Sequence, residues 1–172
     1  MPITASDINY RLSGGAGNTS PNASLGGAMS TVGGGVITTA VLNNLFDNVS
    51  GAEAAAGDIE YRGIYIENAH GSLTWEAVVA WIDSVTTSAD DEFDIALADE
   101  AVGAAMETIT DESTAPVGPS FTRPVSKGTG LSIGNIAFGL YKGIWIRRTV
   151  TAGAAAINNN SGSIRCEGDT AA

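Results

Sequence analysis

The chain of 172 residues has the length of one ordinary domain, which is enough to build a core without disulfides or metals. Eight Lys and Arg stand against 19 Asp and Glu, and the net charge of -11 disfavours binding to nucleic acid or to an anionic membrane. The single cysteine, Cys166, excludes an internal disulfide and a cysteine-rich zinc module. We therefore expect no cofactor, and the polar first twelve residues predict no secretory signal.

The N-terminal part begins with a short alternating segment and continues as a glycine-rich stretch. Residues 7–12 alternate polar and apolar side chains, which predicts a strand. Residues 14–35 contain eight glycines, one proline and no charged residue, without sustained periodicity. This composition predicts an extended arm, either a disordered linker or a segment that becomes ordered against a partner chain. The predicted organisation is a strand and arm over residues 1–35 and one domain over residues 36–172.

The rest of the chain predicts many short strands separated by turn residues. In residues 73–85 the period-two pattern places Trp75, Ala77, Val79 and Trp81 on one face. One helical turn fits within residues 50–58. The predicted strands lie within residues 36–42, 59–68, 73–85, 93–98, 106–110, 131–133, 141–150 and 161–167. Such a series, without helices for crossovers, predicts an all-β fold: an antiparallel β-sandwich or jelly roll.

Two of these strands share a sequence pattern. Residues 61–66 read YRGIYI, and residues 141–146 read YKGIWI, so six positions match in kind. The shared order predicts two equivalent strands, one in each sheet, with their isoleucines facing the core. It also predicts that each glycine leaves space for a neighbouring side chain.

No motif in the sequence supports catalysis. Ser132 lies in a G-x-S-x-G pattern, but no helix is predicted after it, and the only histidine, His70, precedes it in the chain. The glycine-rich stretches lack the lysine of a phosphate-binding loop. We therefore do not expect an enzyme.

A ligand-binding module is the alternative that the residues leave open. The run at residues 90–94 holds four carboxylates, which favours a solvated loop and is compatible with a structural calcium site. Trp75 and Trp81 could supply the platform of a carbohydrate-binding site beside this run. Such a module would be a calcium-dependent or carbohydrate-binding β-sandwich.

Three segments suggest a family. The arm LSGGAGNTSPNASLGGA, the segment YKGIWIRRTVTAGAAA and the terminal SIRCEGDTAA resemble the small acidic structural proteins of tailed-bacteriophage virions, most of all the capsid decoration (cement) proteins. The resemblance implies a non-enzymatic protein that binds the outer capsid lattice as a homodimer or homotrimer. Its partner would be the major capsid protein or another virion protein, and it would be made in the cytoplasm of the bacterial host. A tail, baseplate or fibre component is the neighbouring alternative.

In this interpretation, aromatic, basic and N-terminal apolar side chains would contact the partner. Arg147 and Arg148 end a predicted strand, and alternation places their side chains on opposite faces, so at least one should point outward. The candidate interface residues are Tyr10, Arg11, Leu12, Leu25, Tyr61, Tyr65, Trp75, Trp81, Trp145, Arg147 and Arg148.

Overall fold

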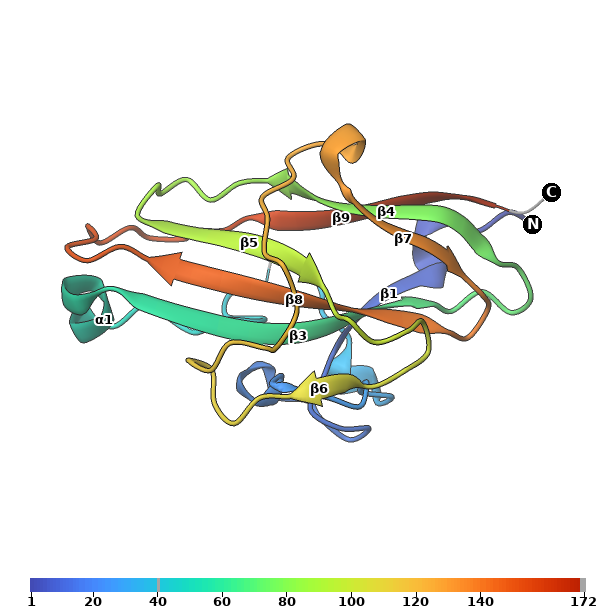
Figure 1. Cartoon of the computed structure of the whole chain (residues 1–172), viewed down its shortest axis with the longest axis horizontal. Helices are drawn as coiled ribbons and strands as arrows, with labels where there is room; N and C mark the ends of the chain where they lie inside the picture. Colours follow the sequence, from blue (N-terminus) through green and yellow to red (C-terminus); the bar gives the residue numbers. More distant parts are fainter. Residues whose placement is uncertain (40, 171–172) are drawn as a thin grey trace.

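The computed structural model describes residues 1–39 and 41–170. Within them, seven strands form two antiparallel sheets that pack face to face, in the orders β1-β3-β8-β5 and β7-β4-β9, and β2 pairs with β6 as a small ribbon (Figure 1). The all-β, antiparallel sandwich class is confirmed. The elements are β1 (Ile8–Leu12), β2 (Gly26–Gly27), α1 (Gly51–Ala56), β3 (Asp58–Asn68), β4 (Trp75–Ser84), β5 (Asp91–Leu97), β6 (Met106–Thr108), β7 (Leu131–Ile136), β8 (Tyr141–Val150) and β9 (Ser163–Thr170), with 3-10 turns at Ala5–Asp7, Pro21–Ala23, Gly33–Gly35 and Lys127–Thr129.

The described residues of the predicted strand at residues 36–42 form no strand. Val36 forms an isolated bridge with Arg11, and the Ile37 N–H donates to Tyr10 O at 2.8 Å. Beyond Ile37 the described residues leave the edge of β1 and cross the side of the sandwich as a loop. The predicted helical turn is confirmed as α1. Ser50 stabilises its first turn, because Ser50 Oγ accepts the Glu53 N–H, as an N-cap does.

The two strands with the repeated pattern lie side by side in one sheet, whereas the sequence interpretation placed one in each sheet. Ile64 of β3 is directly opposite Ile144 of β8. Around this pair, each glycine faces the aromatic residue of the other strand: Gly63 is opposite Trp145, and Tyr65 is opposite Gly143. The isoleucines face the smaller sheet and form the main core, as expected.

A β-bulge in β4 changes which side chains face that core. Ala77 has a φ of 49°, and the pairing with β7 and β9 shifts between Trp75 and Val79. Trp75 and Val78 consequently belong to the main core, whereas Ala77 is exposed. The predicted common face of Trp75, Ala77, Val79 and Trp81 is therefore wrong, since a period of two does not continue through an inserted residue.

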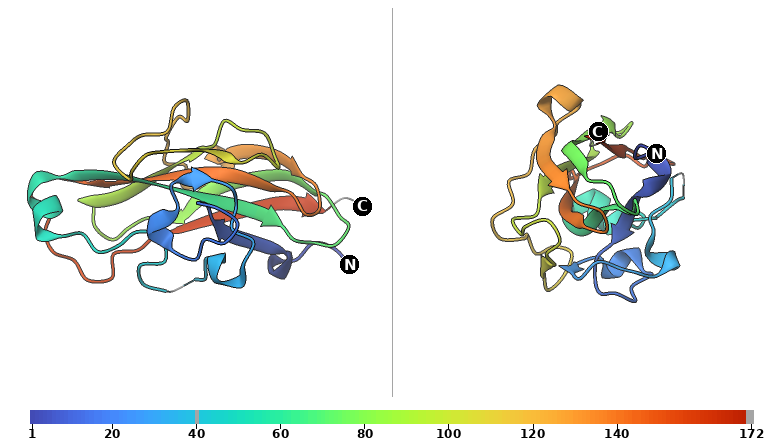
Figure 2. Two further views of the ribbon diagram at one scale, coloured as in Figure 1. Left: turned by 90° about the horizontal axis from the view of Figure 1, so that it is seen from below. Right: turned by 90° about the vertical axis from the view of Figure 1, so that its right-hand side faces the viewer.

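The glycine-rich segment folds back onto its own chain. Ser24 O accepts the Gly63 N–H at 2.8 Å, and Leu25 O accepts the Ile109 N–H at 2.9 Å. Figure 2 shows this segment as a layer on the face of the larger sheet that points away from the smaller one. The structure thus differs from an extended arm, because the glycines allow close approach to β3 and β6. It does not test whether the segment also contacts a partner.

Under this layer lies a second core, on the opposite face of β3 and β8 from the first. Its buried residues are Met29, Tyr61, Tyr65, Ala96, Ala98, Met106, Ile109 and Trp145. Met106 is central, because its N–H donates to the Tyr65 hydroxyl at 2.7 Å and its side chain fills the space beside Gly63 and Gly143. β3 and β8 are therefore covered on both faces.

Candidate functional site

The sandwich has an open cavity of about 880 Å³ at the end where α1 lies. The volume is in the range of about 300 to 1,000 Å³ that is typical of ligand-binding pockets. β1 pairs only with the second half of β3, so the loop after Ile37 is what closes the side of the sandwich there. The inner wall is apolar and includes Ile64, Ile146, Phe93 and Ile164.

The mouth of the cavity carries exposed apolar side chains. Val41 and Leu42 lie on one loop and Ile157 on another, with 53%, 73% and 48% of their surfaces exposed. Asparagines from the same two loops, Asn43 and Asn158 among them, lie beside these residues in the lining. An apolar wall with an apolar and amide rim suits binding of an apolar segment.

One wall of the cavity contains a buried ionic cluster. Arg148 Nε and Nη2 pair with the Glu60 carboxylate, and Nη1 donates to Asp47 O at 2.7 Å. Glu60 is 2% exposed. The Phe46 ring contacts two guanidinium groups, with its centroid 5.0 Å from Arg148 Cζ and 5.5 Å from Arg62 Cζ. Because Arg148 is already held by carboxylates, this wall is a rigid support and leaves little charge for a ligand.

Arg62 extends the cluster further into the molecule. Its side chain is fully buried, its Nη1 donates to Tyr61 O at 3.2 Å, and its Nη2 pairs with Glu112. Each arginine of the cluster therefore has an acidic partner, as buried charges require.

The pH dependence of stability should report on Glu60. Burial raises its pKa above the usual 4.5, and this effect outweighs the attraction of Arg148. Above pH 4.5 the folded state then binds more protons than the unfolded state, so the contribution of Glu60 to stability falls as pH rises through the raised pKa. As pH rises through that window, we therefore expect the free energy of unfolding of the wild type to fall relative to that of Glu60→Gln, which has no carboxyl group to titrate at this position. Urea denaturation of both proteins at successive pH values measures the difference, and a constant difference would contradict it.

The structure places most of the predicted interface residues inside the single chain. Trp75, Trp81, Tyr61, Tyr65 and Trp145 are buried, and Leu12 is buried with them. Tyr10 and Leu25 are half-buried and pack on the two cores. Arg11 is half-buried and pairs with Glu67. Little of these side chains is left for a partner, because Trp75 lies in the main core, and Tyr61, Tyr65 and Trp145 lie in the second core under the glycine-rich segment.

The two adjacent arginines point to opposite faces, as predicted. Arg148 faces the main core, whereas Arg147 faces the other side and donates to Asp94 at 2.7 Å. Arg123 also donates to Asp94, at 2.9 Å, and pairs with Glu92. The acidic run is thus mostly part of β5, and two of its four carboxylates, Glu92 and Asp94, are paired with arginines, which corrects its interpretation as a solvated loop.

The alternative of a calcium or carbohydrate site finds no support in this geometry. No group of three His, Cys, Asp or Glu side chains able to hold a metal occurs within residues 1–39 and 41–170. Trp75 lies in the core, and the Trp81 ring is covered, with Arg165 Cζ 5.7 Å from its centroid. Neither tryptophan offers a flat surface for a sugar.

The groups considered for catalysis are not assembled. Ser132 is exposed on β7, opposite Val79 in the β4 register, and not on a strand-to-helix turn. His70 Nδ1 accepts the backbone N–H groups of Ser72 and Leu73 at 3.1 and 3.0 Å. Burial raises the pKa of the Cys166 thiol to about 12, so this thiol stays protonated at neutral pH.

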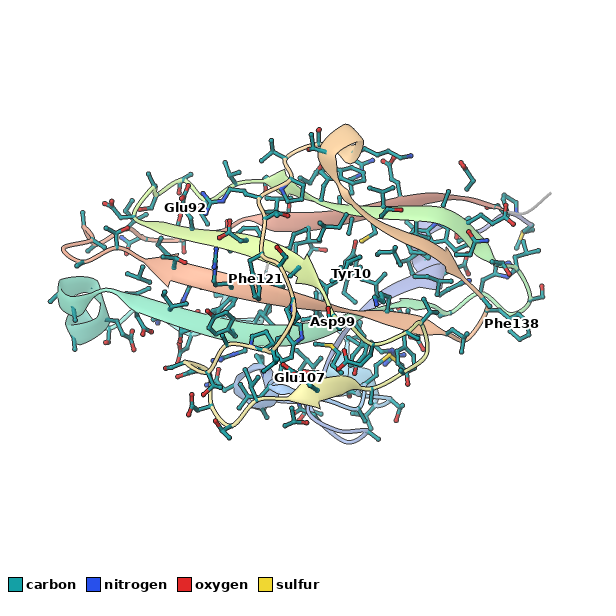
Figure 3. All side chains as sticks on the ribbon, in the orientation of Figure 1. Tyr10, Glu92, Asp99, Glu107, Phe121 and Phe138 are labelled. Atoms are coloured by element: carbon teal, nitrogen blue, oxygen red, sulfur yellow. The ribbon has the colours of Figure 1, made fainter. Side chains whose placement is uncertain are left out.

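Sequence reasoning missed the residues that give the surface its apolar character. Besides the rim of the cavity, Phe138 in the turn between β7 and β8 is 56% exposed and lies at the end of the molecule opposite α1 (Figure 3). Val117 is 81% exposed. For Phe138, Val117 and Ile157 a usable signal was present, because these apolar residues fall in segments that read as loops and have no strand face on which to be buried. Val41 and Leu42 gave no such signal, because they fall in the predicted strand at residues 36–42.

The fold is a β-sandwich with an open cavity between its sheets. Comparison with known proteins adds no name, since no family model, no curated protein and no solved structure matches the chain. None of the helices in the described part of the chain is long and apolar enough to cross a membrane.

Proposed function

We propose that the protein is a non-enzymatic structural component of a tailed-phage virion that binds the outer capsid lattice and stabilises it. The observation that carries this proposal is the cavity at the α1 end. Its rim exposes Val41, Leu42 and Ile157, while Arg148 of its wall is already paired with Glu60. Such a site is suited to holding an apolar segment of the major capsid protein.

The connections between the sheets also support a virion protein. From β3 to β9, with β6 left aside, successive strands alternate between the two sheets. Jelly rolls, a common architecture of capsid proteins, are connected in this way, and we infer that the sandwich is a variant of that fold. Fold alone does not define function, so this point is secondary to the cavity. The proposed location is the capsid surface, after synthesis in the bacterial cytoplasm.

Fractionation of virus particles tests the proposal. Particles from the source culture would be purified on a density gradient, separated into heads and tails, and blotted with an antibody to the recombinant protein. The expected result is a signal in the head fraction. A signal in the tail fraction alone would replace the capsid location with a tail, baseplate or fibre role, and no signal in particles would overturn the proposal.

The cavity can be tested separately with a surface variant. Leu42→Asp should reduce occupancy on heads stripped of the protein by about tenfold or more, because it places a charge at the apolar rim, and losing an apolar anchor costs about 1 to 2 kcal/mol. Val125→Asp, at a comparably exposed valine that does not line the cavity, is the matched control and should bind normally. Equal binding by Leu42→Asp and the wild type would exclude the cavity as the attachment site.

A further inference from the structure

The inner face of the larger sheet changes from apolar to acidic between the depth of the cavity and its mouth. Residues opposite one another on paired strands face the same side of a sheet, so the register of β3 and β5 with β8 defines rows of side chains on this face. From the depth to the mouth the rows are Ile64, Ile144 and Leu97; Arg62, Ile146 and Ile95; Glu60, Arg148 and Phe93; and Asp58, Val150 and Asp91. The outermost row therefore has a carboxylate on each side of Val150.

These two carboxylates have no cation of their own. Asp91 lines the cavity, and its Oδ2 accepts a hydrogen bond from Asn160 Nδ2 at 3.0 Å. Asp58 is half-buried, as Asp91 is. Within residues 1–39 and 41–170, neither carboxylate forms an ion pair. The negative charge of this row is thus uncompensated by the chain itself.

The cation nearest to this row is committed elsewhere. Among the described residues that line the cavity, Arg148 is the one with a basic side chain, and it pairs with Glu60 and lies 3.5 Å from Asp47 Oδ1. Asp47 and Glu92 also line the cavity, and only Glu92 has a cation outside the lining, Arg123. The site is therefore apolar inside and negative at its mouth. Charge complementarity disfavours an anionic occupant, such as a fatty acid or an acidic segment, and favours an apolar group with a cation beside it.

The polar groups of the rim fit a peptide better than an alkyl chain. Asn43, Asn48, Asn158 and Asn159 are exposed residues of the lining. A side-chain amide both donates and accepts hydrogen bonds, which matches the N–H and C=O groups of a peptide backbone. An apolar segment that enters the cavity would leave its backbone at this rim.

We propose that the cavity binds a peptide segment in which an apolar side chain stands next to a lysine or arginine. The apolar side chain packs on Ile146 and Phe93, and the cation pairs with Asp91 at the mouth. Asp58 adds a longer-range attraction from the other side of Val150, about 10 Å from Asp91, because neighbouring strands are about 4.8 Å apart. The inference rests on the proposed function only in taking the major capsid protein as the source of the segment.

Binding to heads stripped of the protein tests the role of charge. The double variant Asp58→Asn/Asp91→Asn preserves the shape of the mouth, and the new side chain at position 91 still has an oxygen that can accept from Asn160. We expect it to raise the dissociation constant by about threefold to tenfold, because one half-buried ion pair and one longer-range attraction are lost. Raising the NaCl concentration from about 50 to 500 mM should weaken the wild type more than this variant, because salt screens the attraction.

Glu76→Gln/Asp169→Asn is the matched control. These carboxylates also lie opposite one another in a strand pair, but at the end of β4 and β9 that points away from α1 (Figure 1), and neither lines the cavity. The control removes the same net charge as the mouth variant and should bind as the wild type does. Equal weakening by the two double variants would mean that net charge alone governs attachment, which would overturn the proposal.

Two blocked peptides test the cavity without the capsid. Acetyl-Lys-Leu-Val-Leu-Lys-amide and acetyl-Glu-Leu-Val-Leu-Glu-amide would each be titrated into the protein and followed by the NMR shifts of the Phe93 and Ile146 amides. The lysine peptide should bind at least about tenfold more tightly, because its cations meet Asp58 and Asp91, and the preference should disappear in Asp58→Asn/Asp91→Asn. Equal binding of both peptides, or binding of neither, would overturn the proposal.

The two experiments separate this proposal from the proposed function. Attachment to heads that is lost in Leu42→Asp but unchanged in Asp58→Asn/Asp91→Asn would leave the capsid role in place and overturn the preference for a cation. Selective binding of the lysine peptide without attachment to heads would support the preference and overturn the capsid protein as the source of the segment.

Discussion

Replacing Arg148 with methionine is expected to lower the free energy of unfolding by about 3 to 5 kcal/mol, which is the usual cost of leaving a buried charge without its partner. Glu60, 2% exposed, pairs with Arg148 and would lose that compensation. Phe46 would also lose one of the two guanidinium groups that contact its ring. Urea denaturation at pH 7, followed by tryptophan fluorescence, measures the loss.

Arg147→Met is the matched control, because Arg147 directly precedes Arg148 on the same strand and points to the opposite face. Its side chain is 32% exposed, and its partner Asp94 keeps Arg123. A partly exposed pair of this kind contributes about 1 kcal/mol or less. Equal losses for the two variants would contradict the assignment of Arg148 to a buried pair. The double variant Glu60→Met/Arg148→Met should recover most of the loss, because it removes both charges.

Gly143→Ala is expected to destabilise the protein by about 2 to 3 kcal/mol, since it adds a methyl group to a filled part of the second core. A Cβ at this position would overlap Met106 Cγ and would lie 3.0 Å from the Ala98 Cβ. Met106 cannot move away freely, because its backbone N–H is held by the Tyr65 hydroxyl. Chemical denaturation at fixed pH measures the change.

A second substitution identifies Met106 as the cause. In the Met106→Ala background the same Gly143→Ala change should cost less than it does alone, because the obstructing side chain has been removed. Gly128→Ala serves as the reference, since nothing lies within 4 Å of a Cβ at that position, and it should change stability by about 0.5 kcal/mol at most. Additive losses in the double variant would exclude a clash with Met106.

The local strand pattern could be predicted from the sequence, but the arrangement of strands could not. The alternation around Ile64 and Ile144 correctly placed the isoleucines in the core, and the need for space beside Gly63 and Gly143 was also correct. That the two strands are neighbours in one sheet depends on contacts between residues 80 positions apart. No local pattern encodes such a pairing.

Two features of the structure bear on the candidate site and could not be predicted from the sequence. Tyr65 and Trp145 were candidate interface residues, whereas in the structure they lie in the second core, under the glycine-rich segment. The bulge at Ala77 then reversed the faces of β4, and a positive φ at an alanine has no signature in the sequence. The cavity was missed for a related reason, since it lies where the described residues after Ile37, in a segment of strand-like composition, form no strand.

The central position of β8 has a consequence for how the chain folds during synthesis. β8 lies between β3 and β5, and it leaves the ribosome only after 140 residues have been made. Until then β3 and β5 have no strand between them, and the apolar faces of both stay exposed to water. Most native pairings therefore form late and over long sequence separations, so the nascent chain should fold slowly and should depend on protection from aggregation until its last third is complete.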